Sequence, residues 1–326
     1  MQFNPIYDPQ LELDKRYLRS SAGFVGLLML FLIITMNFTY LTVAVVLALT
    51  GFLPEGGIYQ TNLGLSNGAY LCIYAMIYVL AMGLPLLLLL FTRHRFAKYP
   101  AKSISSGVVY FGVLAAMGVC MGSNVVTNIL VAFLESIGIP SPELPQMLEP
   151  NTTSLVLNLF VMAVLPAILE ELVFRFCVLR ALRPFGDGFA VLVSAVLFGL
   201  MHGNIRQIPF ALMVGLALGY LYVGTNRLWI PMLVHFMNNA LSVCLEYIGF
   251  SMTENAVGWF YTYVIYGLAL LGGLAIPLLF ILYRRQLKTA PKLTRLTFGQ
   301  CIGGLLKSPA FVIALVAFII LLIAGV

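Results

Sequence analysis

Residues 165–175 read Leu-Pro-Ala-Ile-Leu-Glu-Glu-Leu-Val-Phe-Arg and place two carboxylates and a guanidinium in one of the most apolar parts of the chain. The apolar stretch that contains them extends from Leu155 to Leu182. Ionisable groups at membrane depth are costly, so they usually face the interior of a helix bundle or a wet cavity and mark a function. This segment therefore predicts a membrane-spanning helix with a functional polar site around Glu170.

The composition of the whole chain indicates a membrane protein. Of its 326 residues 61% are hydrophobic and only 9% are charged, and the mean hydropathy is +1.00. A soluble domain of this size would lack the polar residues to cover its surface. Several apolar runs reach the ~18–25 residues that a membrane-spanning helix needs. The predicted fold class is therefore an all-α polytopic membrane protein with a bundle of eight or nine transmembrane helices.

The apolar runs fall into three groups along the chain. Residues 1–153 hold spans one to three, residues 154–250 hold spans four to seven with the acidic segment, and residues 251–326 hold the C-terminal spans. The predicted spans are 22–50, 69–91, 108–137, 154–182, 189–202, 209–223, 229–248 and 256–282, with 309–326 as a ninth candidate.

The distribution of Lys and Arg predicts the orientation, because cytoplasmic loops carry an excess of basic residues. The basic residues before the first span place the N-terminus in the cytoplasm, and the basic stretches 92–106 and 284–295 then fall on the same side. The 138–153 loop has no Lys or Arg and falls outside. Arg206 is the one exception to this alternation.

The two glutamates of the fourth span cannot perform the same task, because adjacent helical residues point about 100° apart. Glu171 and Arg175 are four residues apart in the order that favours an acid–base pair on one helix face. This pairing leaves Glu170 without a partner on its own helix, as a candidate general base. The sequence leaves one alternative open, a structural ion pair with a solvated Glu170 at the inner interface.

Pro166 precedes Glu170 by four residues. Proline has no N–H, so it frees a backbone carbonyl one turn back and tends to kink the helix. We therefore expect the helix to be distorted next to Glu170, in a way that opens a cavity there.

Two of the three histidines lie in predicted spans. His202 follows Phe198 by four residues, and His235 precedes Asn239 by four, so each pair shares a helix face. Counted from the inner ends of their spans, Glu170, His202, His235 and Asn239 lie at depths of ~18, ~20, ~9 and ~15 Å. These depths allow the four side chains to converge. A lone histidine in a membrane helix is also often a helix–helix hydrogen-bonding group, and this alternative stays open.

The five cysteines form no C-x-x-C pair, so the sequence predicts neither a thiolate zinc site nor a disulfide framework. Basic residues sit in loops, and no dense basic and aromatic surface suggests nucleic acid. The expected partners are therefore the lipid bilayer and a membrane-associated protein or peptide.

Three polar motifs on successive spans carry a resemblance to a known family. They are Glu170-Glu171-x-x-x-Arg175, Phe198-x-x-x-His202 and His235-x-x-x-Asn239. In order, spacing and placement they resemble the motifs of the CPBP family, the intramembrane proteases of the CAAX-processing and bacteriocin-processing type, also called the Abi family. The resemblance covers about residues 155–250 and makes 154–250 a CPBP-like catalytic core.

The resemblance implies hydrolysis of a peptide bond in a membrane-associated substrate, either CAAX-like or related to bacteriocin processing and immunity. It implies that Glu170 activates water with help from His202, while His235 and Asn239 polarise the carbonyl or stabilise its oxyanion. Glu171, Arg175 and Phe198 would support these residues.

Metal dependence stays open at this point, because both a metalloprotease and a metal-free glutamate mechanism are attributed to the family. The chain lacks H-E-x-x-H. In the metal-dependent case His202, His235 and Glu170 would be three protein ligands of a divalent ion such as zinc.

Two other functions compete with proteolysis. A proton-coupled transporter would use the same side chains as a proton relay, but it predicts repeated halves, which the sequence does not show. A non-catalytic immunity or scaffold protein would keep the fold without the activity. The short loops favour a multi-pass protein of a bacterial plasma membrane.

Overall fold

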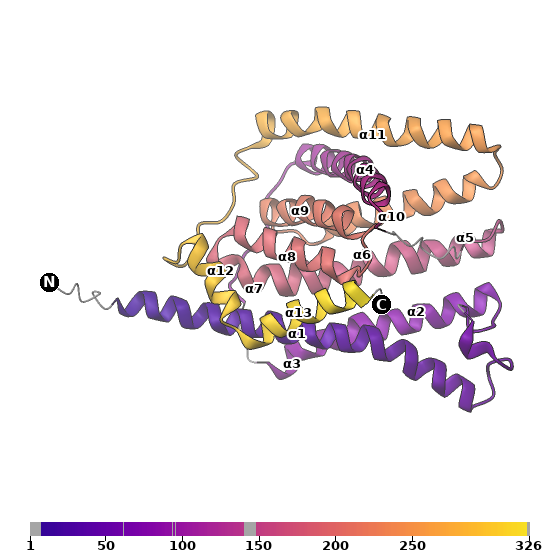
Figure 1. Ribbon diagram of the computed structural model, residues 1–326. Helices are drawn as coiled ribbons and strands as arrows, with labels where there is room; N and C mark the ends of the chain where they lie inside the picture. The colour runs from indigo at the N-terminus through magenta and orange to yellow at the C-terminus, as the bar shows by residue number, and fades with distance from the viewer. Residues whose placement is uncertain (1–7, 61, 93, 95, 140–147, 325–326) are drawn as a thin grey trace.

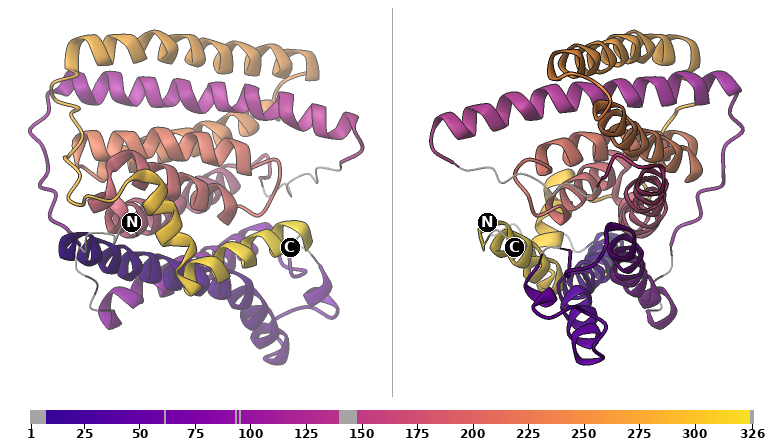
Figure 2. Two further views of the ribbon diagram at one scale, coloured as in Figure 1. Left: turned by 60° about the vertical axis from the view of Figure 1, so that its left-hand side comes forward. Right: turned by 90° about the vertical axis from the view of Figure 1, so that its right-hand side faces the viewer.

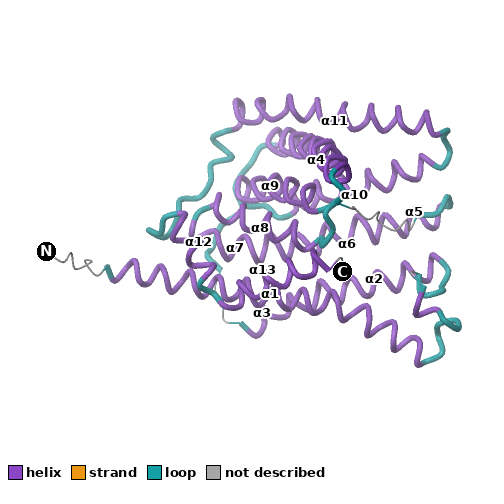
Figure 3. The backbone as a smooth tube through the Cα atoms, in the orientation of Figure 1, coloured by secondary structure: helices purple, strands orange, loops and turns teal. Residues whose placement is uncertain are grey.

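The computed structural model describes residues 8–324 except 61, 93, 95 and 140–147. Throughout this part of the chain the regular structure is helical, as Figure 3 shows, so the predicted all-α class is confirmed. Two members of the basic 92–106 loop, Arg93 and Arg95, lie outside the described residues, as does half of the 138–153 loop, residues 140–147.

Eight of the helices are long enough to organise the bundle. They are α1 (Pro9–Leu49), α2 (Asn67–Gly83), α4 (Ser106–Ser136), α8 (Asp187–Met201), α9 (Ile208–Thr225), α10 (Trp229–Gly249), α11 (Glu254–Tyr283) and α13 (Pro309–Ala324). The shorter elements are η1 (Gly57–Tyr59), η2 (Leu84–Leu87), α3 (Leu88–Phe91), α5 (Thr152–Asn158), η3 (Leu159–Val164), α6 (Leu165–Glu171), η4 (Leu172–Leu179), α7 (Arg180–Leu182), η5 (Arg183–Phe185) and α12 (Phe298–Leu306).

The predicted count of eight or nine spans is not confirmed. Within the described residues six helices are long and apolar enough to cross a membrane, or seven if the bent pair α12 and α13 forms one span. The predicted fifth span is α8, whose 15 residues rise only about 22 Å, less than the ~30 Å hydrocarbon core. The predicted seventh span is α10. It is not apolar enough to count as a membrane-crossing helix, because polar side chains such as His235, Asn239 and Glu246 lower its hydropathy.

The helices lie in layers that Figures 1 and 2 show from three sides. α11 and α4 form one outer layer, α1, α2 and α13 form the opposite one, and α8, α9 and α10 lie between them. α4 and α11 approach closely at Gly118 and Gly272, where an added Cβ would come within 2.4 Å of the partner backbone. Small residues at such crossings let membrane helices pack tightly. This layering surrounds the short helix α8 with longer neighbours.

The fourth span is one continuous helical rod over residues 152–185 that carries two π-helical segments, η3 and η4, on either side of α6. π-bulges occur frequently at functional sites, because they rotate the residues that follow them. Pro166 lies at the start of α6 and donates no hydrogen bond to the carbonyl of Met162, four residues earlier. The expected distortion next to Glu170 is therefore present as a widened helix.

Hydrogen bonds tie the basic segments together at one end of the bundle. Lys102 Nζ donates to the carbonyl of Gly224 at 2.6 Å, and Arg227 Nη2 donates to the carbonyl of Lys102 at 2.7 Å. Asp187 pairs with Arg183 at 2.8 Å and accepts from the backbone N–H of Ala290 at 2.8 Å. The basic stretches that the sequence assigns to one side therefore meet in space.

Arg206, the exception in the charge pattern, lies in the turn between α8 and α9. Its guanidinium pairs with Glu135 near the end of α4 at 2.7 Å. Since this carboxylate offsets its charge, Arg206 adds little net positive charge on the side opposite the basic segments.

Candidate active site

A cavity of about 370 Å³ lies where the fourth span meets α2, α8, α9 and α10. The four residues that the sequence predicted to converge, Glu170, His202, His235 and Asn239, all line it, together with Phe198. They come from α6, the C-terminal end of α8, and α10. The predicted convergence of three separate spans on one site is therefore present in the structure.

Glu170 is 6% exposed, and its two carboxylate oxygens have different surroundings. Oε1 accepts a hydrogen bond from the hydroxyl of Tyr78 on α2. Oε2 lies 3.8 Å from Nε2 of His235, beyond hydrogen-bonding distance, and finds no donor among the described residues. One oxygen is thus anchored, and the other is left to accept a proton at the cavity.

Tyr78 was not identified from the sequence. It lies on α2, far from the motifs, and its ring stacks on that of Tyr74 with 6.3 Å between centroids. Both tyrosines line the cavity. One tyrosine in an apolar span carries no distinguishing pattern. A faint signal was available, because Tyr70, Tyr74 and Tyr78 recur every four residues on one helix face.

Glu171 is fully buried and has two partners. Its Oε2 lies 3.1 Å from Nε of Arg175, so the predicted i,i+4 pair is confirmed. Its Oε1 lies 2.9 Å from Nδ1 of His235, a contact that the spacing rule did not anticipate. A carboxylate accepts only, so Nδ1 carries the ring proton that it binds. The interpretation of Glu171 as a purely structural partner of Arg175 is therefore incomplete, because Glu171 also orients His235.

Phe198 occupies the centre of the polar cluster. The guanidinium of Arg175 lies over its ring at 4.6 Å from the centroid, a cation–π geometry. The rings of His202 and His235 meet it edge to face, with centroids 5.0 and 6.0 Å away. Phe198 therefore supports both histidines at once, in line with the supporting position that its motif predicts.

His202 caps the C-terminal end of α8. Its Nδ1 lies 2.8 Å from the backbone carbonyl of Phe198 and must donate to it, since a carbonyl only accepts. Both histidines are therefore held through Nδ1, and Nε2 is the nitrogen that each keeps for other contacts.

Asn239 is tied to the distorted fourth span. Its Nδ2 donates to the carbonyl of Met162 at 2.9 Å, the same carbonyl that Pro166 leaves without a donor in the α-helical pattern. Its Oδ1 accepts from Nδ2 of Asn238 at 3.1 Å. Asn238 also lines the cavity, is buried, and its own Oδ1 finds no donor among the described residues. Asn238 was not predicted from the sequence, because it occupies an unspecified position of the motif His235-x-x-x-Asn239.

A metal site formed by Glu170, His202 and His235 is not supported by this arrangement. Within the described part of the chain no three His, Cys, Asp or Glu side chains are grouped so that they could hold a metal ion. We therefore derive no step through a metal.

Comparison with known proteins points to membrane proteases. Residues 152–241 match the family model described as type II CAAX prenyl endopeptidase Rce1-like. The putative membrane peptidase YdiL of Bacillus subtilis (strain 168) is 25% identical over 175 residues, which are 53% of this chain and 71% of that protein. The membrane-embedded CAAX protease MroQ of Staphylococcus aureus (strain USA300) is 28% identical over 115 residues, 31% of this chain and 47% of that protein.

No solved structure matches the chain. The family model covers α5 to α10 and therefore contains all three motifs, so the resemblance to the CPBP family is confirmed. It leaves out α2, which supplies Tyr78. The site thus combines a segment that resembles the family with a residue from outside that segment.

The buried pair of Glu171 and Arg175 predicts which variants lose stability and which recover it. Arg175→Ala leaves Glu171 buried without its cation, which typically costs roughly 3–5 kcal/mol of stability, so we expect a large drop in the thermal unfolding midpoint. Exchanging the two, Glu171→Arg with Arg175→Glu, should recover part of that drop. Activity should not return, because no carboxylate then faces His235. An exchange that restores activity as well would remove Glu171 from the positioning of His235.

Proposed function

We propose that this chain, a membrane protease of the CPBP type, hydrolyses a peptide bond of a membrane-associated protein or peptide at the cavity around Glu170. The observation that carries the proposal is the arrangement of Glu170, His202 and His235 on one cavity inside an apolar bundle. An ionisable cluster at that depth is costly to maintain unless it has a function. The names of the two bacterial relatives support the same activity.

The cavity must hold water as well as substrate, because the surrounding bilayer supplies none. In the proposed step Glu170 takes a proton from water through Oε2, the oxygen without a donor. The water oxygen then attacks the carbonyl carbon of the scissile bond, and the carbonyl oxygen becomes an oxyanion. His202 assists through Nε2. The proton held by Glu170 passes to the leaving amine as the C–N bond breaks.

The oxyanion requires donors that are already in place. Asn239 has two N–H groups on Nδ2, and its bond to the Met162 carbonyl accounts for one of them. His235 is held by Glu171 with Nε2 toward Glu170, so its protonated ring would donate into the same region. We assign stabilisation of the oxyanion to these two residues. Asn238, hydrogen-bonded to Asn239, fixes the amide orientation.

The names of a relative and of the family model support the proposed substrate class. One is named a CAAX protease, and the matching family model describes a CAAX prenyl endopeptidase. A CAAX-like segment, or a peptide related to bacteriocin processing or immunity, reaches the membrane surface as an extended chain. Such a chain exposes its peptide bonds, which a buried catalytic carboxylate can then reach.

The proposal includes a location and an orientation. We place the protein in a bacterial plasma membrane with its N-terminus in the cytoplasm, in accordance with the Lys and Arg bias. The gathering of the basic segments at one end of the bundle supports a single cytoplasmic face.

Cysteine labelling tests the orientation. In a background with the exposed Cys72 replaced, a membrane-impermeant maleimide added to intact cells should modify a cysteine placed at Glu55 but not one placed at Ser103. Both positions are exposed in the structure, so access and not burial decides the result. Labelling of the cysteine at position 103 alone would show that the orientation is the reverse of the proposed one.

Glu170→Gln keeps the shape of the side chain and removes the base. We expect the variant to fold with a nearly unchanged unfolding midpoint. The cleavage termini that the wild-type enzyme generates in a membrane proteome should disappear. Asn239→Ala should leave measurable cleavage, because loss of one oxyanion donor costs about 10²–10³ in rate. A folded Glu170→Gln protein that produces the wild-type set of termini would exclude Glu170 as the base. Activity lost to a chelator and restored by zinc would instead favour metal chemistry.

Tyr78→Phe removes only the hydroxyl that donates to Glu170. We expect kcat to fall by about tenfold, since a hydrogen bond to a charged group contributes roughly 1.5–3 kcal/mol, with little change in KM. Tyr74→Phe, which keeps the hydrogen bond to Glu170, serves as the control. An unchanged kcat in Tyr78→Phe would limit Tyr78 to packing.

A further inference from the structure

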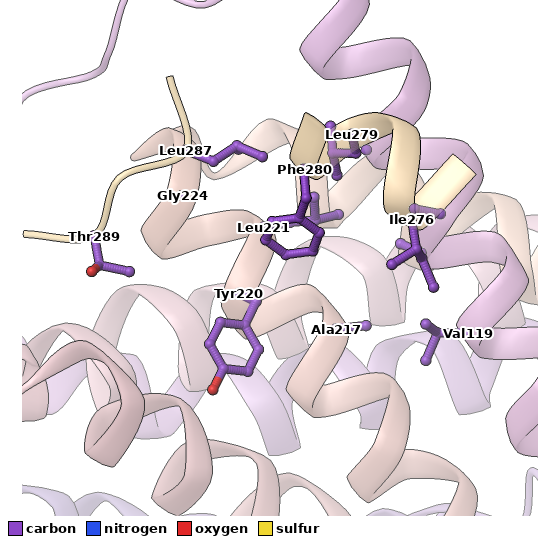
Figure 4. Close-up of a pocket in the computed structure, with 13 residues that line it drawn as sticks. Val119, Ala217, Tyr220, Leu221, Gly224, Ile276, Leu279, Phe280, Leu287 and Thr289 are labelled. Carbon is purple, nitrogen blue, oxygen red and sulfur yellow. The ribbon is translucent and has the colours of Figure 1, made fainter. Parts of the chain in front are cut away.

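A second cavity, of about 380 Å³, lies away from the candidate active site, between α4, α9 and α11. Figure 4 shows Tyr220 and Leu221 of α9, Val119 of α4 and Phe280 of α11 around it. Its lining is almost entirely apolar.

Small residues make room in this cavity, and large exposed ones border it. Ala116 and Ala217 leave space where larger side chains would close the helix interface. Tyr220 and Phe280 are 55% and 60% exposed, so the cavity is continuous with the surface of the bundle. In a membrane-spanning bundle such a surface faces lipid chains. The shape therefore fits an acyl chain better than a polar ligand.

Basic residues lie next to one end of the cavity in the chain. Leu287 and Thr289, in the segment that follows α11, line it, and Lys288 lies between them in the chain. Arg284 follows Phe280 by four residues, which places it on the same helix face one turn further along. Arg284 and Lys288 are exposed, and neither has an acidic partner among the described residues.

The surroundings add further uncompensated positive charge. Lys102 Nζ donates to the carbonyls of Gly224, which lines the cavity, and of Lys288, and has no carboxylate partner in the described part of the chain. Burial lowers the pKa of Lys102, and Arg183 lowers it further. The nearest acid, Asp187, is occupied by Arg183 and by a backbone N–H. An anion placed here would meet cations that are not already neutralised.

We propose that this cavity binds one anionic glycerophospholipid, with an acyl chain between α4, α9 and α11 and the phosphate at Lys288 and Arg284. Basic pockets between membrane helices on the cytoplasmic side are the usual sites for anionic headgroups. A neutral phospholipid would fill the apolar part equally well but leave the cations without a counter-charge. Charge complementarity therefore selects the anionic lipid.

The test uses the purified full-length chain, with binding of dioleoyl phosphatidylglycerol and dioleoyl phosphatidylcholine measured by native mass spectrometry. The wild-type protein should retain one phosphatidylglycerol after mild delipidation and prefer it over phosphatidylcholine. Arg284→Gln with Lys288→Gln should weaken phosphatidylglycerol binding by about tenfold or more and abolish the preference. Lys98→Gln, at an exposed basic residue that is not adjacent in the chain to a residue lining the cavity, should change nothing. Equal binding of the two lipids by the wild-type protein would overturn the proposal.

A second pair of variants separates a seated lipid from attraction to a basic surface. Ala217→Phe fills the cavity and should remove the retained phosphatidylglycerol, while Ile281→Phe, outside the cavity on the exposed face of α11, should not. The thermal unfolding midpoints of both variants are measured first, to establish that each protein is folded. Retention of the lipid in a folded Ala217→Phe protein would show that the basic residues act without the cavity. Since binding is the readout, the result does not depend on the proposed protease activity.

Discussion

The buried contact of Glu171 with Arg175 and His235 constrains much of the surrounding structure. All three side chains lie in the apolar core, and removing one partner of such a pair leaves an unpaired buried charge, at a cost of roughly 3–5 kcal/mol. The fourth span and α10 must therefore keep a fixed register. Phe198 adds α8 to this unit, because its ring packs against Arg175 and both site histidines. The register in turn determines which oxygen of Glu170 faces the cavity.

The fourth span meets this constraint by departing from regular α-helix. Its π-helical segments lie on either side of the short α-helical piece that carries both glutamates. Pro166 leaves the carbonyl of Met162 without its α-helical donor, and Asn239 supplies one from α10. A residue of the motif His235-x-x-x-Asn239 thus also supplies a hydrogen bond to the backbone one turn before Pro166, close to Glu170. Asn239 therefore both lines the polar cavity and satisfies a backbone carbonyl of the apolar bundle beside it.

Much of the site was readable from the sequence because charges and histidines stand out in an apolar chain. The i,i+4 spacing was sufficient to predict the pair of Glu171 and Arg175, since both lie on one helix. The contacts of Glu171 with His235 and of Glu170 with Tyr78 join distant segments, and no local pattern encodes them. The predicted number of spans is not confirmed, because hydrophobicity alone does not show that the predicted fifth span forms a helix of only 15 residues, α8.

In the proposed mechanism Glu170 is a base that activates water and not a nucleophile that forms an acyl-enzyme. A single turnover in water labelled with heavy oxygen distinguishes the two, with enzyme in excess over a substrate identified from its cleavage termini. Mass spectrometry then measures the label in the new carboxyl terminus of the product and in the peptide that contains Glu170. We predict one labelled oxygen in the product and none in Glu170. Label in the carboxylate of Glu170 would show a covalent intermediate and contradict the account.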